Sequence, residues 1–134
     1  MQNILRRLIR LQNPLMKWLL RSPFQGIVSG FYMLITVTGR KSGRKYETPV
    51  QYHQEGNYLW IITSGDYVWW HNLRGGANVH VYLRGHDYEA SAASFTDHEI
   101  VLATLKRIYP SMGVEQSERL ATNSVALEVQ LQPN

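Results

Sequence analysis

The chain has 134 residues, 44% of them hydrophobic and 18% charged, a composition typical of one folded globular domain with a single core. The absence of cysteine excludes disulfides, thiolate metal sites and cysteine nucleophiles. The formal net charge of +4 is lopsided, because the residues before Glu47 carry nine Lys or Arg and no acid, which indicates a local anionic partner.

The sequence shows neither a membrane span nor a secretion signal. No apolar run approaches the roughly 18–20 residues needed to cross a bilayer. No small-residue cleavage site follows an apolar N-terminal core. We therefore expect a cytoplasmic protein.

Residues 3–21 are amphipathic at helical spacing, with apolar side chains on one face and five cations on the other. This pattern predicts an N-terminal amphipathic helix over residues 1–22. Two interpretations remain open. The helix covers one end of a sheet, or residues 1–21 bind an anionic membrane surface, which would place the protein on the inner face of the membrane.

The periodicity then changes from helical to strand-like, with turn residues between short apolar runs. A helix at 67–73, with Asp66 as its N-cap, and a helix at about 97–109, capped by Thr96 or Asp97, interrupt the strands. Six predicted strands lie at residues 31–38, 45–53, 58–64, 78–83, 88–94 and 125–131. This order predicts a mainly β (α+β) single domain over 1–134, with a small six-stranded antiparallel barrel at 31–131 carrying helical caps.

A basic turn joins the first two predicted strands. Gly39 and Gly43 permit a sharp turn with exposed amide groups. Its cations are Arg40, Lys41, Arg44 and Lys45. Amides and cations together predict a site for phosphate or carboxylate. The alternative is a hairpin whose charges serve only solubility.

Other candidate sites have weaker support. The five histidines show no helical His-x-x-x-His spacing and no accompanying acidic cluster, so we predict no metal site. A haem-ligand role for one of them remains open. Ser64, Asp66 and His71 include the residue types of a hydrolytic triad, but the glycines of a nucleophile elbow are missing.

Three motifs occur in order along the chain. They are Thr38-Gly39-Arg40-Lys41-Ser42-Gly43, then Thr48-Pro49-Val50, then Trp69-Trp70-His71-Asn72-Leu73. Over residues 11–109 the sequence resembles the deazaflavin-dependent nitroreductase and quinone reductase family. The resemblance implies a split β-barrel fold and the cofactor coenzyme F420. Close relatives hold flavin mononucleotide (FMN), haem or fatty acids, and related barrels often form homodimers across a sheet face.

The resemblance also implies roles for individual residues. The cofactor's phosphate would face Arg40, Lys41, Ser42 and Gly43, with support from Arg44. Its ring would meet the backbone of Thr48, Pro49 and Val50, and of Ile62, Ser64 and Gly65 on a facing strand. The pocket walls would be Trp69, Trp70 and Asn72. Two positions depart from the family pattern: Tyr46 replaces a basic residue, and Asp66 ends a shortened loop where a cation is expected.

The implied reaction is hydride transfer from the reduced deazaflavin to a quinone, nitro compound or enone. Solvent, Tyr46, Tyr67 or His71 would deliver the accompanying proton. A second class is a non-catalytic barrel that binds flavin, haem or a fatty acid at the membrane surface. A nucleic-acid module ranks last, because the aromatic residues are not interleaved with the cations.

Overall fold

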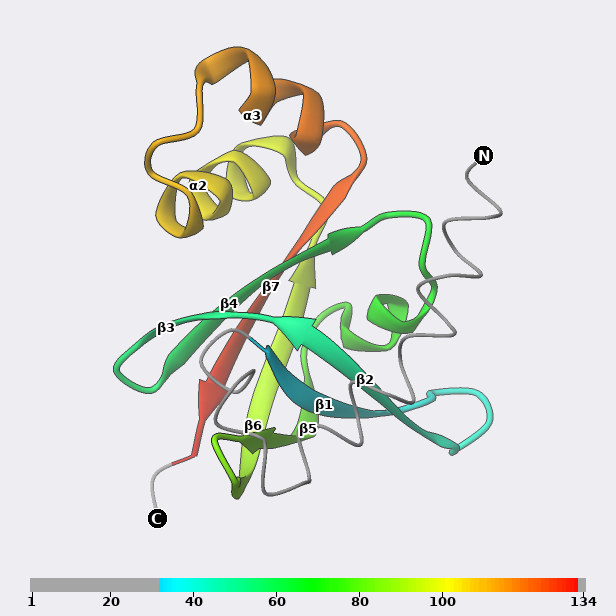
Figure 1. The fold of residues 1–134 in the computed structure, drawn as a ribbon. Helices are drawn as coiled ribbons and strands as arrows, with labels where there is room; N and C mark the ends of the chain where they lie inside the picture. The colour runs from blue at the N-terminus through cyan, green and yellow to red at the C-terminus, as the bar shows by residue number, and fades with distance from the viewer. Residues whose placement is uncertain (1–31, 133–134) are drawn as a thin grey trace.

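The computed structural model describes residues 32–132, so the predicted helix at 1–22 and its membrane contact lie outside the described residues. These residues form a curled antiparallel sheet that makes a half-barrel, with two α-helices at one end (Figure 1). The strands are β1 Tyr32–Thr38, β2 Lys45–Gln51, β3 His53–Glu55, β4 Tyr58–Ser64, β5 Ala77–Leu83, β6 His86–Phe95 and β7 Ser124–Leu131. The helices are a 3-10 helix, η2 Trp69–Leu73, and the α-helices α2 His98–Ile108 and α3 Val114–Ala121.

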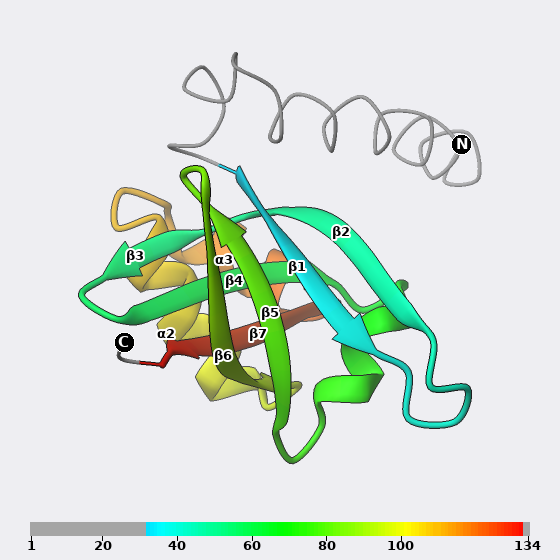
Figure 2. The same cartoon turned by 90° about the horizontal axis from the view of Figure 1, so that it is seen from below.

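The sheet curls because one continuous segment of the chain supplies the strands at both edges of the sheet. The strand order is β2-β1-β5-β6-β7-β4-β3, and every pairing is antiparallel. Strands β2 and β3 are separated only by Tyr52, yet β2 pairs with β1 and β3 pairs with β4. Figure 2 shows this segment passing from one side of the sheet to the other.

The prediction of six strands was therefore wrong, because the sheet has seven. The predicted strand at 45–53 is divided at Tyr52, where the chain changes its hydrogen-bonding partner. The strand predicted at 58–64 has the bounds of β4, and the antiparallel α+β architecture is confirmed.

One predicted helix needs correction, and one observed helix was not predicted. The helix predicted at 67–73 is a shorter 3-10 helix that starts after Val68, without a side-chain cap from Asp66. Helix α3 was not predicted, because its sequence VEQSERLA has almost no apolar stripe and only Ser117 and Ala121 are buried.

The main core fills the inside of the curl. It combines alternate residues from the strands with Trp70 and Leu73 of η2. A smaller cluster on the outer side of the sheet includes Val101 and Leu105 of α2 and Ala126 of β7. The two helices therefore cover one outer face of the sheet, and the opposite part of the molecule carries the basic turn (Figure 1).

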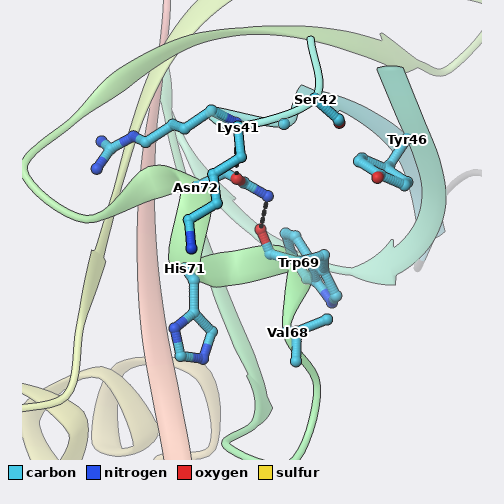
Figure 3. Close-up of a pocket in the computed structure, with 9 residues that line it drawn as sticks. Lys41, Ser42, Tyr46, Val68, Trp69, His71 and Asn72 are labelled. Carbon is cyan, nitrogen blue, oxygen red and sulfur yellow. Dashed lines mark hydrogen bonds between the residues drawn. The ribbon is translucent and has the colours of Figure 1, made fainter. Parts of the chain in front are cut away.

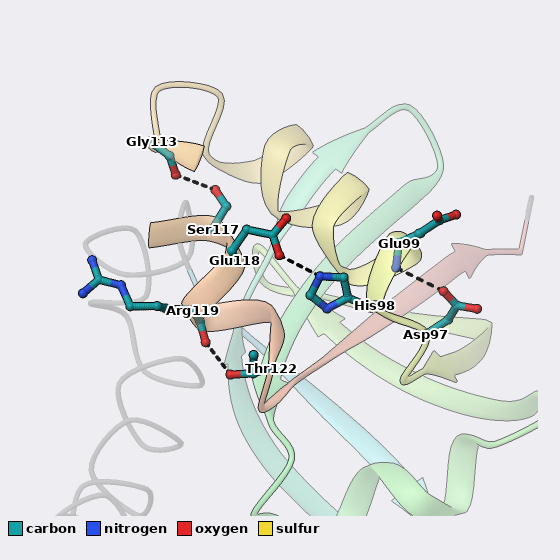
Figure 4. A network of polar contacts seen from close by, with 8 residues as sticks. All are labelled: Asp97, His98, Glu99, Gly113, Ser117, Glu118, Arg119 and Thr122. Carbon is teal, nitrogen blue, oxygen red and sulfur yellow. Dashed lines mark hydrogen bonds and ion pairs between the residues drawn. The ribbon is translucent and has the colours of Figure 1, made fainter. Parts of the chain in front are cut away.

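The helical pair is fixed by polar contacts at its ends (Figure 4). Asp97 accepts a hydrogen bond from the Glu99 N–H at 3.1 Å, so Asp97, one of the two predicted caps, is the N-cap of α2. His98 Nε2 lies 2.8 Å from Glu118 Oε2, which joins α2 to α3. Within residues 32–132, no helix is long and apolar enough to cross a membrane.

Candidate functional site

The basic turn between β1 and β2 is closed by its two glycines. The Gly39 N–H donates to the Arg44 carbonyl at 2.7 Å, and the Gly43 N–H donates to the Gly39 carbonyl at 2.9 Å. Gly43 has a φ of 71°, which residues with side chains rarely adopt. A Cβ atom on Gly39 would lie only 2.8 Å from Ser42 Oγ. The glycines therefore allow a tight turn that presents its cations at the surface.

Hydrogen bonds connect this turn to η2 and the residues after it. The Arg40 N–H donates to Asn72 Oδ1 at 3.0 Å, and Asn72 Nδ2 donates to the Trp69 carbonyl at 3.0 Å. The Arg40 guanidinium donates through Nη2 to the Arg74 carbonyl and, at 3.3 Å, to the Gly76 carbonyl. The turn and η2 are thus held together although they are more than 30 residues apart in sequence.

A cavity of about 510 Å³ lies between the turn and η2. Tyr46 and Trp69 supply aromatic walls, and Val68, which is 75% exposed, forms an apolar lip. Figure 3 shows the Lys41 side chain extending across the cavity toward His71. The lining residues are Gly39, Arg40, Lys41, Ser42, Tyr46, Val68, Trp69, His71 and Asn72. The cavity therefore combines flat apolar walls with a cation.

The fold brings seven sequence-predicted site residues together around this cavity. They are Arg40, Lys41, Ser42, Tyr46, Trp69, His71 and Asn72. Val68 was missed, because an apolar residue between Tyr67 and Trp69 has the pattern of an ordinary buried helix position. Its exposure depends on how the 3-10 helix begins, which the residue pattern does not reveal.

Five further predicted residues lie in the turn or on the strand that follows it and do not line the cavity. Gly43 and Arg44 belong to the same turn. Thr48, Pro49 and Val50 lie on β2, which continues from the turn. Thr48 and Pro49 are half-buried there, and Val50 is buried in the main core.

The predicted residues of β4 and the loop after it have other neighbours. Ile62 packs against the smaller cluster beneath the helices. Ser64 Oγ accepts a hydrogen bond from the Asp66 N–H at 3.1 Å. The Gly65 N–H donates to the Asn123 carbonyl at 2.9 Å, and Asn123 Nδ2 lies 3.3 Å from Asp66 Oδ1. The Asp66 carboxylate therefore meets the chain just before β7 and does not line the cavity.

Trp70 and Trp69 point in different directions from η2. Trp70 is only 4% exposed and belongs to the main core, whereas Trp69 is half-buried and lines the cavity. The Trp70 ring stacks on the His71 imidazole with centroids 3.9 Å apart, and the Arg74 guanidinium lies 5.0 Å from the indole. Tyr67 packs against the core and does not line the cavity.

The other histidines do not assemble a metal centre in the described part of the chain. Within residues 32–132, no group of three or more His, Asp or Glu side chains is arranged to hold a metal ion. His80 lies between two carboxylates, 2.7 Å from Asp87 and 3.2 Å from Glu89, on opposite ring nitrogens. The hydrogen bond to Asp87 is the largest cause that raises the pKa of His80; partial burial opposes it, and Glu89 adds to the rise.

Solved structures of several split-barrel proteins have a similar fold. An F420-H2 dependent reductase is 19% identical with a TM-score of 0.52, over 75% of this chain and 93% of that protein. A general stress FMN/FAD binding protein from Xanthomonas citri is 20% identical with a TM-score of 0.56, over 85% and 84%. A haem storage protein from Vibrio cholerae is 10% identical with a TM-score of 0.53, over 85% and 92%. The chain therefore shares its half-barrel fold with these three proteins.

Residues 21–130 match the F420H2-dependent quinone reductase family, and the chain belongs to that family. No curated protein gives a significant match. The family confirms the predicted resemblance, the prediction of an oxidoreductase and coenzyme F420 as the predicted cofactor.

Proposed function

We propose that the protein transfers a hydride from reduced coenzyme F420 to a small electron-poor acceptor of the quinone, nitro or enone class. The family supports the cofactor and the reduction of a quinone. The observation that carries the proposal is the cavity between the basic turn and η2, which places apolar aromatic walls beside cations.

The cavity has the size and the chemistry of a small-molecule site. Its volume of about 510 Å³ lies within the usual range of roughly 300–1,000 Å³ for small-molecule sites. Trp69 and Tyr46 offer flat surfaces to a planar ring. The ammonium of Lys41 has no hydrogen-bond or ion-pair partner among residues 32–132, so it is available to an anionic group.

In this proposal the turn binds the phosphate of the coenzyme. Lys41 is the principal cation, and Ser42 offers polar groups beside it, whereas the Gly43 N–H is used inside the turn and Gly43 contributes by shaping that turn. Arg44 contributes charge from the exposed side of the turn. The guanidinium of Arg40 donates to two backbone carbonyls, so we propose that it positions the turn and does not contact the phosphate.

The ring would lie against β2 and η2. The half-buried backbone of Thr48 and Pro49 continues from the turn, and Val50 anchors that strand in the core. Trp69 closes the other side. The predicted contribution of Ile62, Ser64, Gly65 and Trp70 would be indirect, since these residues support the surrounding walls and do not line the cavity.

The bound coenzyme would supply the hydride, and the acceptor would take up that hydride together with one proton. Tyr46 and His71 both line the cavity and carry exchangeable protons, so they are better placed to deliver the proton than Tyr67. The stacking of His71 on Trp70 fixes the orientation of its imidazole at the cavity edge.

The direct test is turnover of reduced coenzyme F420 with menadione, followed by the absorbance of the coenzyme. We expect oxidation that depends on the protein, and a decrease of about ten-fold or more in kcat/KM for Lys41→Gln, because a charge-assisted contact is lost. Arg119→Gln removes a cation from the exposed face of α3 and is the matched control. Absence of turnover with the wild-type protein would reject the assignment.

A non-catalytic barrel that stores an amphiphile is the second candidate. The solved haem storage protein shares the fold, and the exposed apolar lip at Val68 would suit an apolar ligand. FMN in place of coenzyme F420 is a related alternative, because an FMN/FAD binding protein also shares the fold. Mass spectrometry of the extracted ligand separates these cases. The homodimer, the membrane contact of residues 1–21 and the cytoplasmic location stay predictions.

A further inference from the structure

We infer that Arg40 and Asn72 are positioning residues, which form an interlock that fixes the basic turn against η2 and so sets the width of the cavity. This inference rests on the proposed function for its consequence in binding. The geometry of the interlock itself depends only on hydrogen bonds within the protein.

The first half of the interlock is the side chain of Asn72. Its Oδ1 accepts the Arg40 N–H at 3.0 Å from the turn, and its Nδ2 donates to the Trp69 carbonyl at 3.0 Å within η2. One amide group therefore spans the two walls of the cavity (Figure 3). An ionised carboxylate or an aliphatic side chain at this position could not make both bonds, because neither offers an acceptor together with a donor.

The second half is the side chain of Arg40. Its guanidinium bonds the carbonyls of Arg74 and Gly76, at the point where the chain leaves η2 and enters β5. Both carbonyls accept from Nη2 of a planar, pre-organised guanidinium, whereas a lysine ammonium is a compact point charge on a flexible stem. Arg40 thus joins the turn to the residues after η2, and Asn72 joins the turn to η2 itself.

The two cations of the Arg40-Lys41 pair consequently have different tasks. Arg40 uses its charge on backbone carbonyls, and Lys41 extends across the cavity. The cavity lies between the two segments that the interlock joins. Loosening the interlock would widen the cavity and misplace Lys41 and Trp69.

Amide hydrogen exchange of the coenzyme-free protein tests the interlock without reference to the cofactor. In Asn72→Ala we expect the Arg40 amide to exchange about ten-fold faster or more, because it loses its acceptor. Asn78→Ala, which truncates an exposed asparagine on β5, is the matched control and should leave that rate unchanged. Equal exchange rates at Arg40 in Asn72→Ala and in the wild type would overturn the inference.

The salt dependence of coenzyme binding distinguishes positioning from direct contact. Arg40→Gln and Lys41→Gln each remove one cation. We expect both to weaken coenzyme F420 binding about ten-fold or more, but only Lys41→Gln should flatten the dependence of Kd on salt. Arg40→Lys keeps the charge and should still bind weakly, because a strongly hydrated ammonium on a flexible stem holds the two carbonyls less rigidly than a planar guanidinium does.

Two outcomes would refute the role of Arg40. One is full rescue of binding by Arg40→Lys, and the other is an equal loss of salt dependence in Arg40→Gln and Lys41→Gln. If the wild-type protein does not bind coenzyme F420 at all, the proposed function fails, and the exchange experiment still decides whether the interlock exists.

Discussion

The turn that carries Lys41 depends on the lack of a side chain at Gly39, and Gly39→Ala tests this directly. The added Cβ would lie 2.8 Å from Ser42 Oγ and 3.1 Å from Tyr46 Cε2. Both distances are shorter than ordinary van der Waals contact. Ser42 Oγ also accepts the Arg44 N–H at 3.1 Å, so a rotation of Ser42 that relieves the clash would break this hydrogen bond.

The magnitude follows from these two contacts. Loss of the Ser42 hydrogen bond costs about 1 kcal/mol, and a side chain forced off its preferred rotamer, here Tyr46, costs roughly 0.5–1.5 kcal/mol. We therefore expect Gly39→Ala to lower the free energy of unfolding by about 1–3 kcal/mol, which is also the typical cost of overpacking. Coenzyme binding should weaken as well, because Lys41 would move.

Urea unfolding followed by circular dichroism measures this change. Gly113→Ala is the control, because a Cβ there meets nothing within 4 Å. A double-mutant cycle with Ser42→Ala tests the cause: removal of Oγ should reduce the cost of Gly39→Ala. The reasoning is wrong if Gly39→Ala costs the same with Ser42 as with alanine at that position.

Three other predictions concern the rest of the described chain. The raised pKa of His80 stabilises the fold fully below the unfolded value of about 6.5, and this stabilisation is lost as pH rises through the folded pKa. Because His80 is 38% exposed, the free energy of unfolding in urea should fall between pH 6 and 9 by less than about 1 kcal/mol more in the wild type than in His80→Gln. Parallel pH profiles of the two proteins would contradict this prediction. Leu73→Ala should lower the free energy of unfolding by about 2–5 kcal/mol, because Leu73 is fully buried; a loss below 1 kcal/mol, on the order of a surface change, would argue against its core position. Val68→Ser should leave thermal stability unchanged and raise KM for menadione, since Val68 is an exposed lip of the cavity; an unchanged KM would place the acceptor elsewhere.

Local patterns predicted most of the strands because their causes are local. Apolar runs identified β4 and β7, alternating residues identified β5, and side chains suited to capping at Thr96 and Asp97 identified the start of α2. The break at Tyr52 was not predictable in this way. It exists because the curled sheet offers a different partner on each side of that residue, and this is a property of the whole fold.

The candidate site shows the same division between local and distant causes. The basic turn could be recognised from Gly39 and Gly43, and the aromatic block from Trp69. The sequence could not show that Arg40 is held by carbonyls 34 and 36 residues away while Lys41 is available to a ligand. Likewise, only the path of η2 shows that Trp70 is buried in the core.

The central claim is that the cavity between the basic turn and η2 holds coenzyme F420 through Lys41. A fluorescence titration of the wild type, Lys41→Gln and the control Arg119→Gln with coenzyme F420 tests it most directly. The account predicts tight binding by the wild type and the control, and a Kd raised about ten-fold or more in Lys41→Gln. Equal affinity of all three proteins for the coenzyme would contradict it.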